Sequence, residues 1–243
     1  MYNPDDCGIP VATCSGPIDG EIEFCESKGF GYAVSMGPTI PSRVPVMILS
    51  NVTLFPGMML PLFIFEPRYR RMLADVLEGN RMFAVAMLKP GGHQETAVPV
   101  GGVGLIRASV QNEDGTSNLI LQGLDRVAIV RSVQYKPYRV VEIAPLPMQE
   151  ECSVTADALM GRLKELLAAR IEPGEHPNPP ALDEKSVNRF MEKLQAVDSP
   201  EQLADMVSCS LIQSSFHRQE ILETVSVEER LRKLIGFLME IKA

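Results

Sequence analysis

The stretch from Val44 to Leu77 reads VPVMILSNVTLFPGMMLPLFIFEPRYRRMLADVL, and it decides the fold. Its first charged residue is Glu66. Pro56-Gly57 separates two apolar runs and favours a tight turn, because proline presets one dihedral angle and glycine accepts a positive φ. After Pro67, which suits a first helical position, apolar residues recur at helical spacing until Gly79. The stretch therefore predicts a strand, a turn, a second strand and a helix.

The composition is that of a soluble globular protein with one large or two small domains. The chain has 243 residues, of which 45% are hydrophobic and 22% are charged. The net charge of −8 disfavours non-specific binding to nucleic acid. Five cysteines are too few, and odd in number, for a disulfide framework, so we expect a reducing compartment, the cytoplasm.

Two further observations bear on where the protein resides. Residues 44–65 are long enough to span a membrane, but their prolines would break a helix and leave amides unsatisfied in lipid, so we expect no membrane span. The amino terminus carries Asp5 and Asp6 where a signal peptide needs basic residues. Both observations agree with the cytoplasmic expectation.

Outward from this stretch, the chain divides into three parts. Residues 1–42 are rich in glycine and proline and lack periodic apolar positions, which predicts a poorly ordered tail. We expect removal of residues 1–35 to cost little stability. Cys7, Cys14 and Cys25 in this tail lack the short paired spacing of a zinc site, so we expect no metal there. Neither the tail nor the rest of the chain predicts a cofactor.

Residues 43–148 predict about six strands and the one helix already described. Three glycines between residues 101 and 104 predict a bulge or a close backbone approach within a strand. Asp114-Gly115 predicts a hairpin. Gly123 to Arg126 predicts a tight turn between two short strands. Strands spaced in this way suggest a small closed or half-closed barrel.

Residues 149–243 change to helical periodicity. We expect helices capped by Ser153, Ser199 and Ser226, with a proline-rich connection over residues 172–180. This part has eleven basic and seventeen acidic residues, whereas residues 44–148 have ten basic and eight acidic residues. The opposite net charges, −6 and +2, favour contact between the two parts, and we expect them to fold as one cooperative unit.

Several motifs resemble the amino-terminal, substrate-binding domain of Lon proteases. They occur in family order from Val46 to about Leu238: Leu54-Phe55-Pro56-Gly57-Met58, Leu60-Pro61-Leu62-Phe63, the segment Gly123 to Arg126, Pro200 to Val207, and Gln219 to Leu231. Glu66-Pro67-Arg68-Tyr69-Arg70-Arg71-Met72 resembles the version in free-standing bacterial proteins of this family. The resemblance implies an α+β fold, a PUA-like β pseudobarrel with one inserted helix, followed by a carboxy-terminal α-helical bundle.

The resemblance extends to binding and not to catalysis. A full Lon protease continues into an ATPase and a Ser-Lys peptidase, whereas this sequence has no Walker A motif and no family dyad. His93, His176 and His217 are each isolated, which disfavours a histidine-based active site. We therefore expect a non-catalytic protein that binds exposed polypeptide segments or a protein partner. Protein quality control is one role for such a protein. The alternative is a small-molecule-binding or RNA-binding PUA-like regulatory module.

The predicted substrate-binding residues lie at the start of the first helix and at the predicted turn: Glu66, Arg68, Tyr69, Arg71 and Arg126. Arginines in a first helical turn oppose the helix dipole, and such a local violation favours a site. The competing interpretation is that these arginines pair with the acidic helical part. Arg126 has its own alternative, a structural role in which its guanidinium bonds carbonyls or a carboxylate across the end of the barrel.

Overall fold

The computed structural model describes residues 38–91, 96–146, 154–170 and 184–240. The chain divides into two units, residues 1–39 and 40–243, and the elements below all belong to the second unit. The predictions for the amino-terminal tail, the Ser153 cap, the connection at residues 172–180, His93 and His176 lie outside the described residues.

Six strands of the described residues form one sheet, which closes on itself through one additional strand pairing. They are β1 (Arg43–Leu49), β2 (Met59–Ile64), β3 (Met82–Met87), β4 (Val100–Gln111), β5 (Ser117–Gln134) and β6 (Val140–Pro145). The strand order is β2-β5-β4-β3-β1-β6, and β6 also pairs with β5. Five strands therefore close a barrel, while β2 pairs with the first half of β5 outside that closed circuit. All pairings are antiparallel except β1 with β3.

The stretch that opens the sequence folds as predicted. Gly57 takes a φ of 73° in the turn between β1 and β2, and Pro67 starts helix α1 (Pro67–Glu78). One face of α1, with Tyr69, Met72, Leu73 and Val76, is buried against the barrel core. Of the bulge or close backbone approach predicted at the β4 glycines, the close approach is confirmed, because the Leu54 backbone lies directly against Gly102.

One local prediction is wrong. Gly123 to Arg126 is not a turn between two short strands but the middle of the 18-residue strand β5. The strand bulges at Leu124, where the register with β4 shifts, and then continues. Gly123 is needed for a close approach instead, because the backbone of the segment before Gly57 crosses the sheet at this point and Gly57 donates to the Gly123 carbonyl at 2.9 Å.

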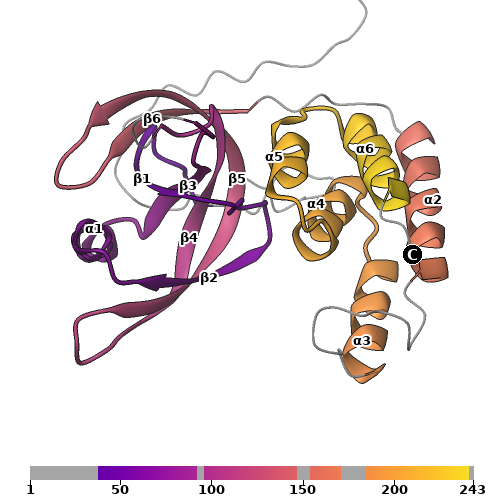
Figure 1. The fold of residues 1–243 in the computed structure, drawn as a ribbon, viewed down its shortest axis with the longest axis horizontal. Helices are drawn as coiled ribbons and strands as arrows, with labels where there is room; N and C mark the ends of the chain where they lie inside the picture. The colour runs from indigo at the N-terminus through magenta and orange to yellow at the C-terminus, as the bar shows by residue number, and fades with distance from the viewer. Residues whose placement is uncertain (1–37, 92–95, 147–153, 171–183, 241–243) are drawn as a thin grey trace, which may run out of the picture. The chain divides into compact units, whose positions relative to one another are not determined.

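Five helices follow the barrel: α2 (Val154–Arg170), α3 (Glu184–Gln195), α4 (Pro200–Leu211), α5 (Ser215–Glu223) and α6 (Val227–Glu240). Two predicted caps are confirmed, since the Ser199 hydroxyl accepts from the Gln202 amide and the Ser226 hydroxyl accepts from the Glu229 amide. Helices α2, α4 and α6 share one apolar core. Figure 1 shows these helices on the opposite side of the barrel from α1.

The helical core includes residues of the barrel part. Phe55 is fully buried within it, and Met58 and Val100 pack against it. Polar contacts add to this junction: the Gln219 side chain donates to the Val100 carbonyl at 2.9 Å, and the Arg218 guanidinium donates to the Asn51 carbonyl at 2.9 Å. The α+β architecture of a barrel followed by helices is therefore as predicted. Among the described helices, none is long and apolar enough to cross a membrane.

Candidate functional site

Four of the five predicted site residues lie together where β2 passes into α1. The carboxylate of Glu66, just before the helix, forms an ion pair with the Arg68 guanidinium at 2.7 Å. That guanidinium also lies 4.4 Å from the centre of the Tyr69 ring. Local pairing thus offsets the unfavourable interaction between Arg68 and the positive end of the helix dipole.

Tyr69 has a structural role at this junction. Its side chain is buried, and its hydroxyl accepts from the Ile48 amide and donates to the Ile48 carbonyl, each at 3.2 Å. These bonds tie the first turn of α1 to β1, so the Tyr69 hydroxyl is engaged within the protein.

Arg71 pairs within its own helix. Its guanidinium lies 3.1 Å from the Asp75 carboxylate, which also accepts from the Tyr138 hydroxyl at 2.8 Å. Desolvation and this carboxylate both raise the pKa of Tyr138 above its ordinary value. Among the contacts that the structure describes, Arg68 and Arg71 pair with the local carboxylates of Glu66 and Asp75. The interpretation that the α1 arginines pair with the acidic helical part stays a prediction.

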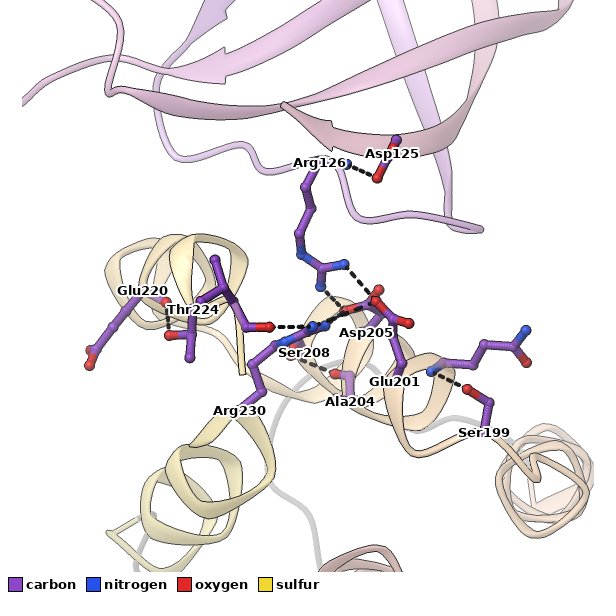
Figure 2. A network of polar contacts seen from close by, with 12 residues as sticks. Asp125, Arg126, Ser199, Glu201, Ala204, Asp205, Ser208, Glu220, Thr224 and Arg230 are labelled. Atoms are coloured by element: carbon purple, nitrogen blue, oxygen red, sulfur yellow. Dashed lines mark hydrogen bonds and ion pairs between the residues drawn. The ribbon is translucent and has the colours of Figure 1, made fainter. Parts of the chain in front are cut away.

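Arg126 lies apart from this group, in a buried ionic network between β5 and the helices (Figure 2). Its side chain is 1% exposed and donates to the Asp205 carboxylate of α4. Arg230 of α6, which is fully buried, lies 3.6 Å from the same carboxylate and 3.5 Å from Glu201. The structural interpretation of Arg126 is confirmed in that its guanidinium bonds a carboxylate, but that carboxylate belongs to helix α4 and not to the end of the barrel.

Burial sets the electrostatics of this network. It raises the pKa of the Asp205 carboxyl group, because desolvation outweighs the attraction of Arg126 and Arg230. Burial, and then the neighbouring Arg126 charge, lower the pKa of Arg230. A polypeptide on the surface could contact Arg126 only if the network opened, so the geometry favours a structural role. Its substrate-binding role stays a prediction.

An exposed apolar stripe on β2 is absent from the sequence-based prediction. Alternate residues of this strand point outward: Met59 is 53% exposed, Phe63 is 55% exposed and Phe65, just beyond the strand, is 59% exposed. The rings of Phe63 and Phe65 stack with their centres 5.9 Å apart. The intervening residues Leu60, Leu62 and Ile64 face the barrel core. We call Met59, Pro61, Phe63 and Phe65 the β2 stripe.

The free edge of β2 accompanies the stripe. The Gly123 amide donates to the Met58 carbonyl, and bonded pairs alternate along an antiparallel ladder, so Leu60, Leu62 and Ile64 bond to β5. The backbone groups of Met59, Pro61 and Phe63 therefore point away from β5, toward the unpaired edge. Pro61 lacks an amide there, which weakens uncontrolled pairing with other strands without closing the edge.

The sequence contained only a weak signal for this stripe. Residues 58–65 are apolar at every position except the turn-prone Pro61, and a continuous apolar run is typical of a strand buried on both faces. Pro61 was the one available sign of an edge strand.

Metal chemistry gains no support from the described residues, among which no group of three or more His, Cys, Asp or Glu side chains is placed to hold an ion. His217 stacks on Phe237 at 3.9 Å between ring centres.

Comparison with known proteins agrees with this architecture. A family model described as the ATP-dependent protease La (LON) substrate-binding domain matches residues 43–240. The Lon protease of Desulfosudis oleivorans is 29% identical over 202 residues, which are 80% of this chain and 23% of that protein. The Lon protease of Dictyoglomus thermophilum is 27% identical over 205 residues, 82% of this chain and 24% of that protein. The chain thus spans about a quarter of the length of these relatives.

Solved structures show the same fold. The amino-terminal domain of a Mycobacterium avium complex Lon protease superposes with a TM-score of 0.65 at 20% identity, covering 82% of this chain and 100% of that one. A Lon N-terminal domain protein from Xanthomonas campestris gives a TM-score of 0.55 at 19% identity, covering 81% and 98%.

Proposed function

The chain belongs to the family of Lon substrate-binding domains, and on this premise we propose that it binds exposed apolar segments of other polypeptides through the β2 stripe. The observation that carries the proposal is the row of Met59, Phe63 and Phe65 side chains, each more than half exposed, on a strand with one free edge. Exposed apolar rows of this kind mark interaction sites, because their transfer from water stabilises a complex.

The strand geometry suggests how a segment would bind. An extended polypeptide can pair with a free sheet edge through its backbone while its alternate side chains contact a row of exposed side chains. The Phe63 and Phe65 rings supply apolar area that varied sequences can contact, and Met59 adds a side chain that adapts its shape. Both properties suit a protein that recognises many unfolded chains and not one fixed sequence.

Several wider statements belong to the same proposal. We infer that the protein acts by binding and not by catalysis, in the cytoplasm, in protein quality control, and that residues 43–243 work as one domain. The family description, which names a substrate-binding domain, and the scarcity of cysteine support this inference. RNA binding is the alternative, and the net charge of −8 opposes it.

The test compares binding of a fluorescein-labelled, permanently unfolded apolar peptide by the parent chain and by a variant with Phe63→Ser and Phe65→Ser. Burial of one Phe contributes about 1.5–3 kcal/mol, so we expect the double variant to lose about tenfold or more in affinity. Both side chains are exposed, so its thermal midpoint is expected to stay near that of the parent.

The matched control is Val130→Ser, which removes another exposed apolar side chain from β5, outside the β2 stripe. Equal loss of affinity in Val130→Ser, or no preference of the parent for unfolded over folded proteins, would overturn the proposal. Salt-dependent retention of RNA, with no retention of peptide, would favour the alternative.

A further inference from the structure

A small cavity opens between the first turn of α1 and the loop that joins β5 to β6. Val46 and Ile48 of β1 form its apolar floor, Pro137 adds an aliphatic ring, and the remaining lining residues are aromatic or cationic: Arg68, Tyr69, Tyr135, Tyr138 and Arg139. Its volume is about 40 Å³, larger than the space that one water molecule needs, about 10–15 Å³. A compact chemical group fits there, whereas a nucleotide does not.

Arg139 supplies the cavity with a cation that pairs with no carboxylate of the described residues. Its guanidinium lies 5.2 Å from the centre of the Tyr135 ring, and none of the ion pairs between described residues includes it. Arg68 and Arg71 differ in this respect, because their guanidinium groups contact Glu66 and Asp75. The stacked ring holds Arg139 without satisfying the donors of its planar fork.

The charges around the cavity are positive in sum. Two of the residues that line it are charged, Arg68 and Arg139, and both are cations, of which Arg68 pairs with the Glu66 carboxylate. The amino terminus of α1 adds its partial positive charge. A compact anion would therefore be attracted to this cavity, and a guanidinium fork matches the two oxygens of a carboxylate.

We propose that this cavity binds a carboxylate group, and that its source is the carboxyl terminus of a bound polypeptide. The apolar floor and the tyrosine walls would contact the last side chain of that polypeptide, while Arg139 and Arg68 hold its carboxylate. The carboxylate site rests on the function proposed above, because that function is the reason for choosing a polypeptide as the source of the carboxylate.

Chain continuity links the cavity to the β2 stripe. Phe65, the last residue of the stripe, and Arg68 are three residues apart, so their Cα atoms lie within about 11 Å. About three or four residues of an extended polypeptide cover that distance. One segment could thus contact the stripe and end in the cavity, which would give a preference for polypeptide ends over internal segments.

The experiment uses two labelled apolar hexapeptides that end in leucine, one with a free carboxylate and one with a terminal amide. Hydrogen bonds from a guanidinium to a charged carboxylate are stronger than those to a neutral amide, so the carboxylate peptide is expected to bind about tenfold tighter. Arg139→Gln should abolish that preference. Arg131→Gln is the matched control, because it removes one exposed arginine of the same hairpin outside the cavity and should leave the preference intact.

A second arm separates this proposal from the function of the β2 stripe. N-acetyl-leucine, N-acetyl-leucinamide, acetate and inorganic phosphate are titrated separately against the intact chain, and the backbone amide signals of Tyr138 and Arg139 are followed by NMR. Saturable shifts with N-acetyl-leucine and not with its amide support the cavity, even if neither peptide binds the stripe. A stronger response to acetate than to N-acetyl-leucine would identify a free small carboxylate, and not a polypeptide end, as the ligand and overturn the assignment of the source.

Three results would overturn the carboxylate site itself. They are equal binding of the acid and amide forms in both arms, an equal loss of preference in Arg139→Gln and Arg131→Gln, and binding of phosphate without binding of any carboxylate. Thermal melts of both variants identify a folding defect, and Tyr135→Ala, which removes the ring beneath Arg139, then replaces Arg139→Gln with the same expected loss.

Discussion

At the scale of single residues, Arg126 forms a buried ion pair between the barrel and the helices. It joins β5 to Asp205, which lies 79 residues away in the chain, and Arg230 reaches the same carboxylate from a third element. A buried ion pair of this kind contributes little net stability relative to an apolar replacement of both partners, but removal of one partner is costly because the other charge stays buried. The Nε atom of Arg126 has no bonding partner among the described residues, so its guanidinium is only partly satisfied.

We predict that Arg126→Met lowers the free energy of unfolding by about 3–5 kcal/mol at neutral pH. The buried Asp205 carboxylate then loses one of its two buried cationic partners and keeps only Arg230. Urea unfolding measures this change. Arg131→Met is the control, since Arg131 of the same strand pairs with Glu142 of β6 while its own side chain is 61% exposed, and loss of that pair is expected to cost at most about 1 kcal/mol.

The same variant has a predicted pH dependence. The pKa of Asp205 is already raised in the folded state, so ionisation of Asp205 weakens folding as pH rises through that pKa. Loss of Arg126 raises this pKa further. The deficit of Arg126→Met should therefore shrink toward acidic pH, where Asp205 is protonated. A deficit that grows on acidification would contradict this assignment.

At the scale of elements, the middle of β5 shows how two segments come into contact. The backbone of Leu54 and Phe55 crosses the sheet over Gly102 of β4 and Gly123 of β5. A Cβ atom on Gly123 would lie 2.0 Å from the Phe55 carbonyl oxygen, and one on Gly102 would lie 2.2 Å from that of Leu54. Only hydrogen fits at these positions, so the motif that resembles a turn is a contact site within a continuous strand.

We predict that Gly123→Ala destabilises the protein by about 1–3 kcal/mol, because the crossing segment must move away from the sheet. Gly161→Ala is the matched control: a Cβ at Gly161 of α2 meets nothing within 4 Å, and alanine should stabilise that helix by about 0.5–1 kcal/mol. Thermal melts followed by circular dichroism compare the two. A neutral Gly123→Ala would mean that the crossing is loose in solution.

At the scale of the whole molecule, the barrel and the helices share their cores. Phe55 is a member of the helical core although it precedes β2, and Met58 and Val100 pack against that core. A barrel without helices would leave these side chains and Arg126 exposed. The net charges of the two parts, +2 and −6, add a favourable attraction between them.

We therefore predict that a fragment of residues 1–148 aggregates and does not melt reversibly. Its exposed apolar residues at the former junction would associate between molecules. Light scattering during a thermal melt, with the intact chain at equal concentration as the control, measures this. A reversible melt of the fragment near the midpoint of the intact chain would show that the two parts fold independently.

The sequence by itself determined the order and type of the elements, because these depend on local signals. The Pro56-Gly57 turn, Pro67 at the start of α1 and the Ser199 cap each act within a few residues, and helical periodicity located the apolar faces. The same local motifs, taken in order, indicated the family. They also placed Glu66, Arg68, Tyr69 and Arg71 in one cluster, because a single helical turn brings them together.

Only the tertiary structure decided what lies against what. The position of Asp205 in the sequence does not tell whether its side chain is exposed or buried. In the structure it is buried, and Arg126 and Arg230 contact it from distant segments of the chain. The outer face of β2 consists of apolar residues, and whether that face is buried depends on an element packed over it; in the structure Met59, Phe63 and Phe65 stay more than half exposed. Periodicity reports how side chains alternate along one element, whereas burial and pairing depend on the other elements that pack against it.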